Sequence, residues 1–170
     1  MPRPTRLLTA LVLTVLLAPL AGCWRADTAS RDTPGTSPVP PSSRLVTDPT
    51  RRAIVDTALA QLGVPYKYGG NNAREGFDCS GLVRYAYSAA GITVPRISRD
   101  QLRATEPVAL ADAQPGDLVF FQSEDYSHVG IYLGEGRFVH APQSGRSVEI
   151  GTFGNDWYRR RFVRAGRVAQ

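Results

Sequence analysis

The middle of the chain contains the stretch on which the fold assignment depends, Gly76-Phe77-Asp78-Cys79-Ser80-Gly81-Leu82-Val83. Asp is a residue type that caps helices, and apolar residues recur at helical spacing from Cys79 to Ala90, before Gly91. The pattern predicts a helix that begins at the cysteine. Because the N-terminus of a helix carries partial positive charge, we expect a thiolate at Cys79 and backbone N–H groups that face a developing oxyanion.

The hydrophobic period differs on the two sides of this stretch. Asp48-Pro49 opens a predicted helix that Gly63 ends, and a short helix is predicted over 98–103. After Pro115-Gly116 the chain contains short β-rich runs separated by Gly or acidic turns, at 117–121, 128–133, 137–141, 147–150 and 160–168. Helices followed by strands predict an α+β domain with N-terminal helices packed on an antiparallel sheet.

The composition limits the class of protein. The chain has 170 residues, of which 42% are hydrophobic, and a net charge of +5, as expected for one globular domain with some additional sequence. Two cysteines are too few for a disulfide scaffold. The densest basic cluster is Arg159, Arg160, Arg161, Arg164 and Arg167. We interpret it as the solvated face of a terminal strand rather than an anionic-partner patch, and we expect no nucleic-acid binding.

The N-terminus has the pattern of an export signal. Arg3 and Arg6 precede an apolar run over 7–20, which is shorter than the about 20 residues that span a membrane. The run ends in Leu20-Ala21-Gly22-Cys23, which resembles the bacterial lipobox. That resemblance implies a signal peptide over 1–22 and a membrane anchor of fatty acyl chains, palmitate among them, on Cys23. An ordinary signal peptide with a chance cysteine is the alternative. The same resemblance to lipoproteins implies that Asp after the cysteine would favour the inner membrane, so with Trp24 there we expect the outer membrane.

A tether is predicted to follow over 23–47. It contains Pro34, Pro38, Pro40 and Pro41 among many Ser and Thr residues, and it has few large apolar side chains. Such a segment cannot bury enough surface to offset the entropy of ordering it. We therefore place the folded domain at 48–170, held away from the membrane.

The candidate chemistry comes from one thiol and two imidazoles. Cys79 is the only cysteine in the predicted domain, and His128 and His140 each lie in a strand-like run. A thiol, a base and an orienting group are what nucleophilic acyl transfer requires, with His140 fixing the tautomer of His128. Two alternatives stay open on spacing alone: an inert buried cysteine with packed histidines, and a Cys-His-His zinc site with an open fourth position.

Several motifs resemble those of the NlpC/P60 family, in the order that the family has them. They are the stretch around Cys79, together with Pro65-Tyr66-Lys67-Tyr68-Gly69-Gly70, Pro95-Arg96-Ile97-Ser98-Arg99-Asp100-Gln101, Pro115-Gly116-Asp117-Leu118-Val119-Phe120-Phe121 and Ser127-His128-Val129-Gly130-Ile131-Tyr132. The resemblance implies a papain-like fold and cleavage of peptide bonds in bacterial cell-wall peptides.

The resemblance also implies roles for individual residues. Cys79 corresponds to the nucleophile, His128 to the general base and His140 to the third polar residue. Tyr66 corresponds to a tyrosine whose hydroxyl lies near the oxyanion, although Tyr68 is close enough to be confused with it.

The same resemblance suggests substrate-binding residues. Asp78 and Ser80 correspond to residues that bind a free amino terminus of the stem peptide in some relatives, and Arg99 is expected to line the cleft. Asp78 has a simpler alternative role as a helix cap.

We therefore expect a thiol peptidase that cleaves the γ-D-glutamyl–diaminopimelate bond or the D-alanyl–diaminopimelate cross-link, as a monomer and without a metal or cofactor. An amidase or acyl transferase on the same scaffold, and a non-catalytic wall-binding lipoprotein, are the alternatives.

Overall fold

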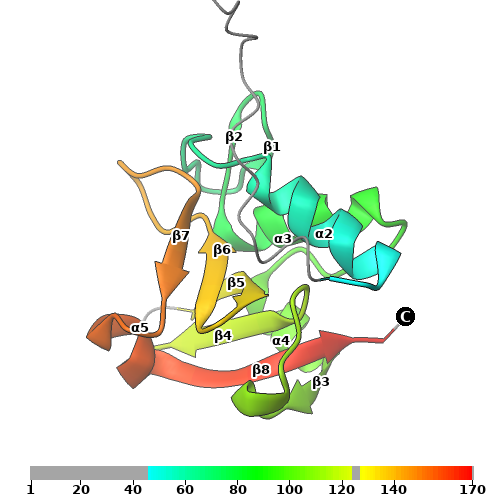
Figure 1. The fold of residues 1–170 in the computed structure, drawn as a ribbon. Helices are drawn as coiled ribbons and strands as arrows, with labels where there is room; N and C mark the ends of the chain where they lie inside the picture. The colour runs from blue at the N-terminus through cyan, green and yellow to red at the C-terminus, as the bar shows by residue number, and fades with distance from the viewer. Residues whose placement is uncertain (1–45, 124–126, 170) are drawn as a thin grey trace, which may run out of the picture. The chain divides into compact units, whose positions relative to one another are not determined.

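Figure 1 shows the computed structural model, which describes residues 46–123 and 127–169. The predicted signal peptide, Cys23 and the tether up to residue 45 lie outside these residues. In the part of the chain that is described, no helix is both long and apolar enough to cross a membrane.

The helices begin where the sequence predicts. Helix α2 (Pro49–Leu59) is capped by Asp48, whose Oδ1 accepts hydrogen bonds from the N–H groups of Thr50 and Arg51. Helix α3 (Cys79–Ala89) begins at the cysteine, and helix α4 (Ser98–Arg103) matches its predicted bounds. Helices α2 and α3 pack together over buried apolar side chains, which lie on one face of the sheet.

The sheet is antiparallel, which confirms the α+β prediction. Its six strands are β3 (Thr105–Val108), β4 (Leu118–Gln122), β5 (Ser127–Gly134), β6 (Arg137–His140), β7 (Glu149–Thr152) and β8 (Phe162–Val168). They pair in the order β3-β8-β4-β5-β6-β7 (Figure 1). A small hairpin of β1 (Asn71–Asn72) and β2 (Gly76–Phe77) precedes α3, and a 3-10 turn spans Leu110–Asp112.

Two elements differ from the prediction. Strand β3 was not predicted. It contains Pro107, whose missing N–H is tolerated because β3 is an edge strand. The start of the predicted last strand is instead helix α5 (Asp156–Arg161). Asn155 caps this helix, and its basic residues lie in the last turn, where they complement the helix dipole.

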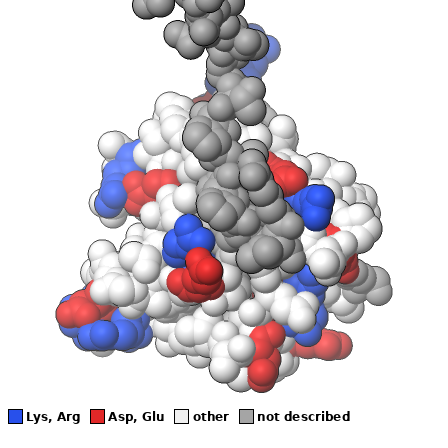
Figure 2. Space-filling model, viewed as in Figure 1, with Lys and Arg blue, Asp and Glu red and all other residues white. Residues whose placement is uncertain are grey.

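The C-terminal arginine cluster is therefore not one strand face, and our interpretation of it was wrong. Arg159 to Arg161 belong to α5, whereas Arg164 and Arg167 lie in β8 and bond inside the domain. Arg164 donates to the carbonyls of Leu102 and Thr105, and Arg167 donates to Asp117 at 2.7 Å. On the face that Figure 2 shows, basic and acidic side chains are interspersed.

Asp117 is more than the turn residue that its position after Pro-Gly suggests. Its side chain is 1% exposed and accepts hydrogen bonds from Arg51 at 2.9 Å and Arg167 at 2.7 Å, and from the Gln114 N–H. The two guanidinium groups and the backbone N–H lower the pKa of this carboxyl, although burial alone would raise it. This ion cluster joins α2 to β4 and β8.

The apolar core lies on both faces of the sheet. Val129, Ile131, Leu133 and Val139 pack on the side of α2 and α3. A second cluster contains Val119, Phe121, Tyr132, Phe138 and Ala165, with Phe153, Tyr158 and Phe162 against it. The aromatic side chains of Phe120, Tyr132 and Phe138 are all buried.

Candidate active site

Cys79 is the first residue of α3, and the chain around it fixes its position. Asp78 caps the helix through a 2.7 Å hydrogen bond from the N–H of Gly81 to Oδ1. Cys79 as a residue is partly exposed, and the backbone N–H groups of Val129 and Ser80 lie where they favour its thiolate. Since Val129 directly follows His128 in β5, the start of α3 meets the sheet beside the predicted base.

The resting thiol does not have the low pKa that we expected from its place at a helix N-terminus. Burial and, to a smaller extent, the negative charge of Asp78 together raise the pKa of Cys79 to about 11. The backbone N–H groups lower it by less than these two effects raise it. This direction is opposite to the thiolate that we expected at the helix N-terminus.

The two imidazoles meet between neighbouring strands. Nε2 of His128 in β5 lies 2.7 Å from Nδ1 of His140 in β6, a hydrogen-bond distance. The rings are 1% and 0% exposed. Burial lowers the pKa of His128 well below its usual value, and burial together with the charge of Arg146 lowers that of His140 to about 3. Both rings are neutral at pH 7.

Groups beyond His140 favour one tautomer of the pair. Nε2 of His140 lies 3.3 Å from the Tyr158 hydroxyl and 3.6 Å from Oε1 of Glu149. A carboxylate only accepts protons, so it favours a proton on this Nε2. Nδ1 of His140 then accepts from His128, and the lone pair of His128 is on Nδ1, where it can receive a proton. This is the orienting role that the sequence predicts for His140.

A glycine in β7 and two aromatic rings pack closely around the imidazole of His140. A Cβ on Gly151 would lie 2.6 Å from the Phe138 ring and 3.0 Å from Nε2 of His140, so β7 can approach His140 only with glycine there. The rings of Phe138 and Tyr158 lie 5.0 and 5.3 Å from that of His140. These apolar neighbours exclude water and cause the low imidazole pKa values.

The structure distinguishes the two candidate tyrosines. Tyr66 packs against the core and bridges to Phe77, two residues before the nucleophile, whereas Tyr68 is 88% exposed. Burial raises the pKa of Tyr66, and negative charge at Cys79 would raise it further, which places the phenol within electrostatic reach of the thiol. Tyr66 therefore remains a proton donor at neutral pH.

The side chains of Asp78 and Ser80 both accept hydrogen bonds from Arg96, a residue to which we had assigned no role. Arg96 donates to both carboxylate oxygens of Asp78, at 3.0 and 2.8 Å, and to Oγ of Ser80 at 3.0 Å. The N–H of Gly69 also donates to Asp78. The capping role of Asp78 is confirmed, and binding of a substrate amine by Asp78 and Ser80 stays a prediction, since the amine would have to compete with Arg96.

Three further residues contact the candidate site, and they differ in how far the sequence alone could have identified them. Arg96 lies in a motif that we had noted, so a basic partner for Asp78 could have been sought there. Glu149 faces His140 across the β6–β7 pairing, which only the strand register reveals, and Tyr158 comes from the unexpected helix α5. Arg99 is exposed on α4, and its role in the cleft stays a prediction.

The zinc-site alternative does not fit the geometry. Within residues 46–123 and 127–169, no three His, Cys, Asp or Glu side chains are placed to hold a metal ion. The facing nitrogens of His128 and His140 are 2.7 Å apart and bond each other, so no ion fits between them.

Comparison with known proteins agrees with this arrangement. The model of the NlpC/P60 family matches residues 63–167. Murein DD-endopeptidase MepH of Escherichia coli is 37% identical over 123 residues, covering 69% of this chain and 45% of that protein. The bifunctional muramidase/DL-endopeptidase CwlT of Bacillus subtilis is 39% identical over 119 residues, covering 68% of this chain and 36% of that protein.

A solved structure shows the same fold. The crystal structure of an NLP/P60-family protein similar to lipoprotein, from Staphylococcus aureus, superposes with a TM-score of 0.67 at 39% identity, covering 72% of this chain and 42% of that one. The fold and the thiol–imidazole site thus define a papain-like domain, as predicted. The chain belongs to the NlpC/P60 family. It spans less than half the length of the curated relatives described above.

Proposed function

We propose that this protein is a thiol-dependent peptidoglycan endopeptidase that hydrolyses stem-peptide bonds. One observation carries the proposal: a thiol at the start of α3 contacts the strand that holds an oriented pair of neutral imidazoles. The relatives with this domain are named DD- and DL-endopeptidases, which supports peptidoglycan as the substrate.

In the first step the sulfur of Cys79 attacks the carbonyl carbon as its proton passes to Nδ1 of His128. Hydrogen bonds between such groups are often long in a free enzyme and shorten when substrate binds. The N–H of Cys79 and the hydroxyl of Tyr66 donate to the oxyanion. The C–N bond then breaks, and His128 returns the proton to the leaving amine, which leaves an acyl-thioester on Cys79.

Water completes the reaction. His128 takes a proton from a water molecule that attacks the thioester carbonyl, and the sulfur leaves and recovers the proton. His140 holds the His128 ring in the tautomer that this needs. The resting thiol and imidazole are both neutral, so charge develops only as the bond to carbon forms.

We also propose that Cys23 is acylated and that the predicted tether over 23–47 holds the domain near the cell wall. Several acyl chains together give durable membrane anchoring, at about 0.8 kcal/mol for each buried CH₂. The mass of the mature N-terminal peptide tests this, since diacylglycerol on Cys23 is expected and an unmodified cysteine would contradict it.

The test of function is digestion of purified sacculi by the wild type and by Cys79→Ala, with mass analysis of the released muropeptides. We expect new stem-peptide ends, from a γ-D-glutamyl or a D-alanyl bond, only with the wild type. Release of glycan from intact peptide would indicate an amidase, and transfer to an added amine would indicate a transferase. Equal products from both proteins, or none, would contradict the proposal and favour a wall-binding role.

A further inference from the structure

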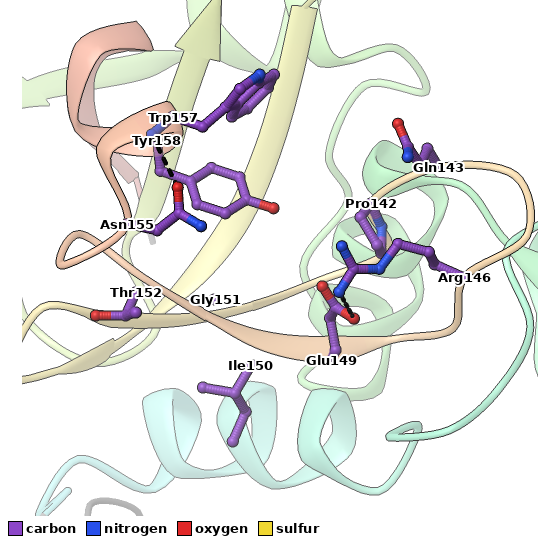
Figure 3. Close-up of a pocket in the computed structure, with 10 residues that line it drawn as sticks. All are labelled: Pro142, Gln143, Arg146, Glu149, Ile150, Gly151, Thr152, Asn155, Trp157 and Tyr158. Carbon is purple, nitrogen blue, oxygen red and sulfur yellow. Dashed lines mark hydrogen bonds and ion pairs between the residues drawn. The ribbon is translucent and has the colours of Figure 1, made fainter.

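Two side chains that line a pocket of about 500 Å³, Glu149 and Tyr158, also reach the imidazole of His140. Figure 3 shows Glu149 paired with Arg146 on one side of this pocket, and Tyr158 on the other side with its hydroxyl directed toward the pair. Nε2 of His140 lies 3.6 Å from Oε1 of Glu149 and 3.3 Å from the Tyr158 hydroxyl. This nitrogen is at the far end of the imidazole pair from Nδ1 of His128, the atom that takes the thiol proton.

The fold fixes the carboxylate of Glu149 at this edge from two directions. Glu149 in β7 is the cross-strand partner of His140 in β6, and Gly151 lets β7 approach the ring closely. Nη2 of Arg146 lies 2.7 Å from Oε2 of Glu149, so Oε1 is the oxygen that faces His140. Because the His140 ring is buried and Glu149 is 29% exposed, solvent screens the interaction between them only partly.

The imidazole pair has two neutral states that carry the same two protons. In the first state, Nε2 of each ring is protonated, His128 donates to Nδ1 of His140, and Nδ1 of His128 can accept the thiol proton. In the second state, Nδ1 of each ring is protonated, His140 donates to Nε2 of His128, and Nδ1 of His128 can no longer act as a base. The 2.7 Å distance between the rings fits both states, so the groups at Nε2 of His140 decide between them.

The two groups at this nitrogen favour different states. A carboxylate only accepts, so Glu149 stabilises the first state, and in the second its charge would face a lone pair. A hydroxyl accepts or donates, and a phenol is better as a donor, so Tyr158 without the carboxylate stabilises the second state. Burial and the charge of Glu149 raise the pKa of Tyr158, which therefore keeps its proton to donate.

We propose that Glu149 is a positioning residue of the reaction, which holds the imidazole pair in its active tautomer against the competing hydroxyl of Tyr158. It acts through His140 rather than on the reacting atoms. The effect on rate rests on the proposed function, whereas the tautomer can be observed without any substrate.

Nitrogen-15 NMR of the imidazoles tests the tautomer, because a ring nitrogen with a proton and one with a lone pair differ widely in chemical shift. The chain contains two histidines in all, so protein purified without a histidine tag gives the signals of this pair alone. At neutral pH we expect a protonated Nε2 and an unprotonated Nδ1 on both rings of the wild type, and mostly the opposite pattern in Glu149→Ala. Lone pairs on Nε2 in the wild type, or an unchanged pattern in the variant, would overturn the proposal.

Hydrolysis of soluble muropeptides tests the effect on rate. Glu149→Ala should lower kcat about tenfold with KM within about twofold, because most molecules then hold His128 in the wrong tautomer. Removing the competing hydroxyl as well, in Glu149→Ala/Tyr158→Phe, should raise kcat again by at least about threefold, since the second state loses its donor. A merely structural role of Glu149 predicts the opposite, a double variant at least as impaired as the single one, and that result would overturn the proposal.

Two controls separate the carboxylate from its ion pair. Arg146→Gln breaks the same ion pair but keeps the carboxylate, so it should keep the wild-type NMR pattern. Glu135→Gln, in the exposed turn between β5 and β6, should keep both the pattern and kcat. A tautomer change in Arg146→Gln as large as in Glu149→Ala would overturn the role of the carboxylate. Absence of muropeptide cleavage by the wild type would overturn the proposed function and the effect on rate, and the NMR pattern would still decide the tautomer.

Discussion

Two buried polar clusters of this domain handle charge in opposite ways. Around Asp117, two arginines and a backbone N–H surround a carboxylate that stays ionised, and its pKa is lowered. Around Cys79 and the two imidazoles, burial raises the thiol pKa and lowers both imidazole pKa values, so every one of these groups is neutral at rest.

This difference in protonation state suggests different roles for the two clusters, one in stability and one in catalysis. A buried charge is stable only when partners surround it, and such a group holds its proton state firmly. A buried group that is kept neutral retains its capacity to gain or lose a proton when a substrate supplies new charge. We therefore expect the first cluster to determine stability and the second to determine activity.

Replacing the thiol should have the largest effect, and only on activity. We expect Cys79→Ala to lose at least about a thousandfold in peptide hydrolysis, because no other group supplies the nucleophile. Its free energy of unfolding should change by no more than about 1 kcal/mol, since no ion pair is broken. Muropeptide release and urea unfolding measure the two quantities, and substantial residual activity would contradict the assignment.

Replacing the buried carboxylate should affect stability instead. Asp117→Asn leaves Arg51 and Arg167 facing a neutral amide, and we expect a loss of about 3 kcal/mol in the free energy of unfolding. Activity per folded molecule should stay within about twofold. The matched control is Asp56→Asn on the exposed face of α2, which should be close to wild type in urea. Equal stability of the two variants would contradict the role of the cluster.

Acid should destabilise the domain in two ranges. Because the pKa values of His128 and His140 are lower in the folded state, the unfolded chain takes up protons first once the pH falls below about 6.5. Stability is then lost at about 1.4 kcal/mol per pH unit for each imidazole. The contribution of Asp117, whose folded pKa is also lowered, is present above the unfolded value of 3.8 and is lost as the pH falls through the folded pKa.

The variant His140→Asn isolates the imidazole contribution. Between pH 6 and 5, its free energy of unfolding should fall with pH about half as steeply as that of the wild type. Urea unfolding at closely spaced pH values measures the slope. An unchanged slope would show that His140 takes up a proton as readily in the folded domain as in the unfolded chain, which would contradict its lowered pKa.

Exposed ion pairs should have the smallest effect. Arg159 and Asp156 pair at 2.6 Å on α5 but are 66% and 58% exposed, so solvent screens them. We expect Arg159→Ala to change the free energy of unfolding by about 0.5 kcal/mol or less, measured in urea. A loss as large as that of Asp117→Asn would mean that burial does not decide which charges matter.

The sequence predicted the helices and most of the sheet because their signals are local. Asp48 and Asp78 cap α2 and α3 as their positions indicate, and the β-rich composition of β5 and β6, bounded by Gly turns, needed no tertiary information. Helix α5 was missed because a run of arginines has no strong period, and Asn155, which caps it, was given no role in the sequence analysis.

The sequence predicted which residues make up the candidate site, but it did not predict their protonation states. The positions of Cys79, His128 and His140 follow from motif and spacing. Their pKa values depend on how completely the fold buries them, for example through Tyr158, which lies 18 residues from His140 in sequence and packs on its ring, and no local pattern reveals this. For the same reason the contacts of Arg96 with Asp78 and of Glu149 with His140 became visible only in the fold.

The most direct test of the central claim is the rate of alkylation of Cys79 by iodoacetamide as a function of pH. The peptide that contains Cys79 is followed by mass, so that Cys23 does not interfere. We predict a rate that still rises steeply between pH 8 and about 10, because the pKa of the resting thiol is raised to about 11. A rate that is already constant below pH 7 would show a thiolate–imidazolium pair at rest and would contradict the account.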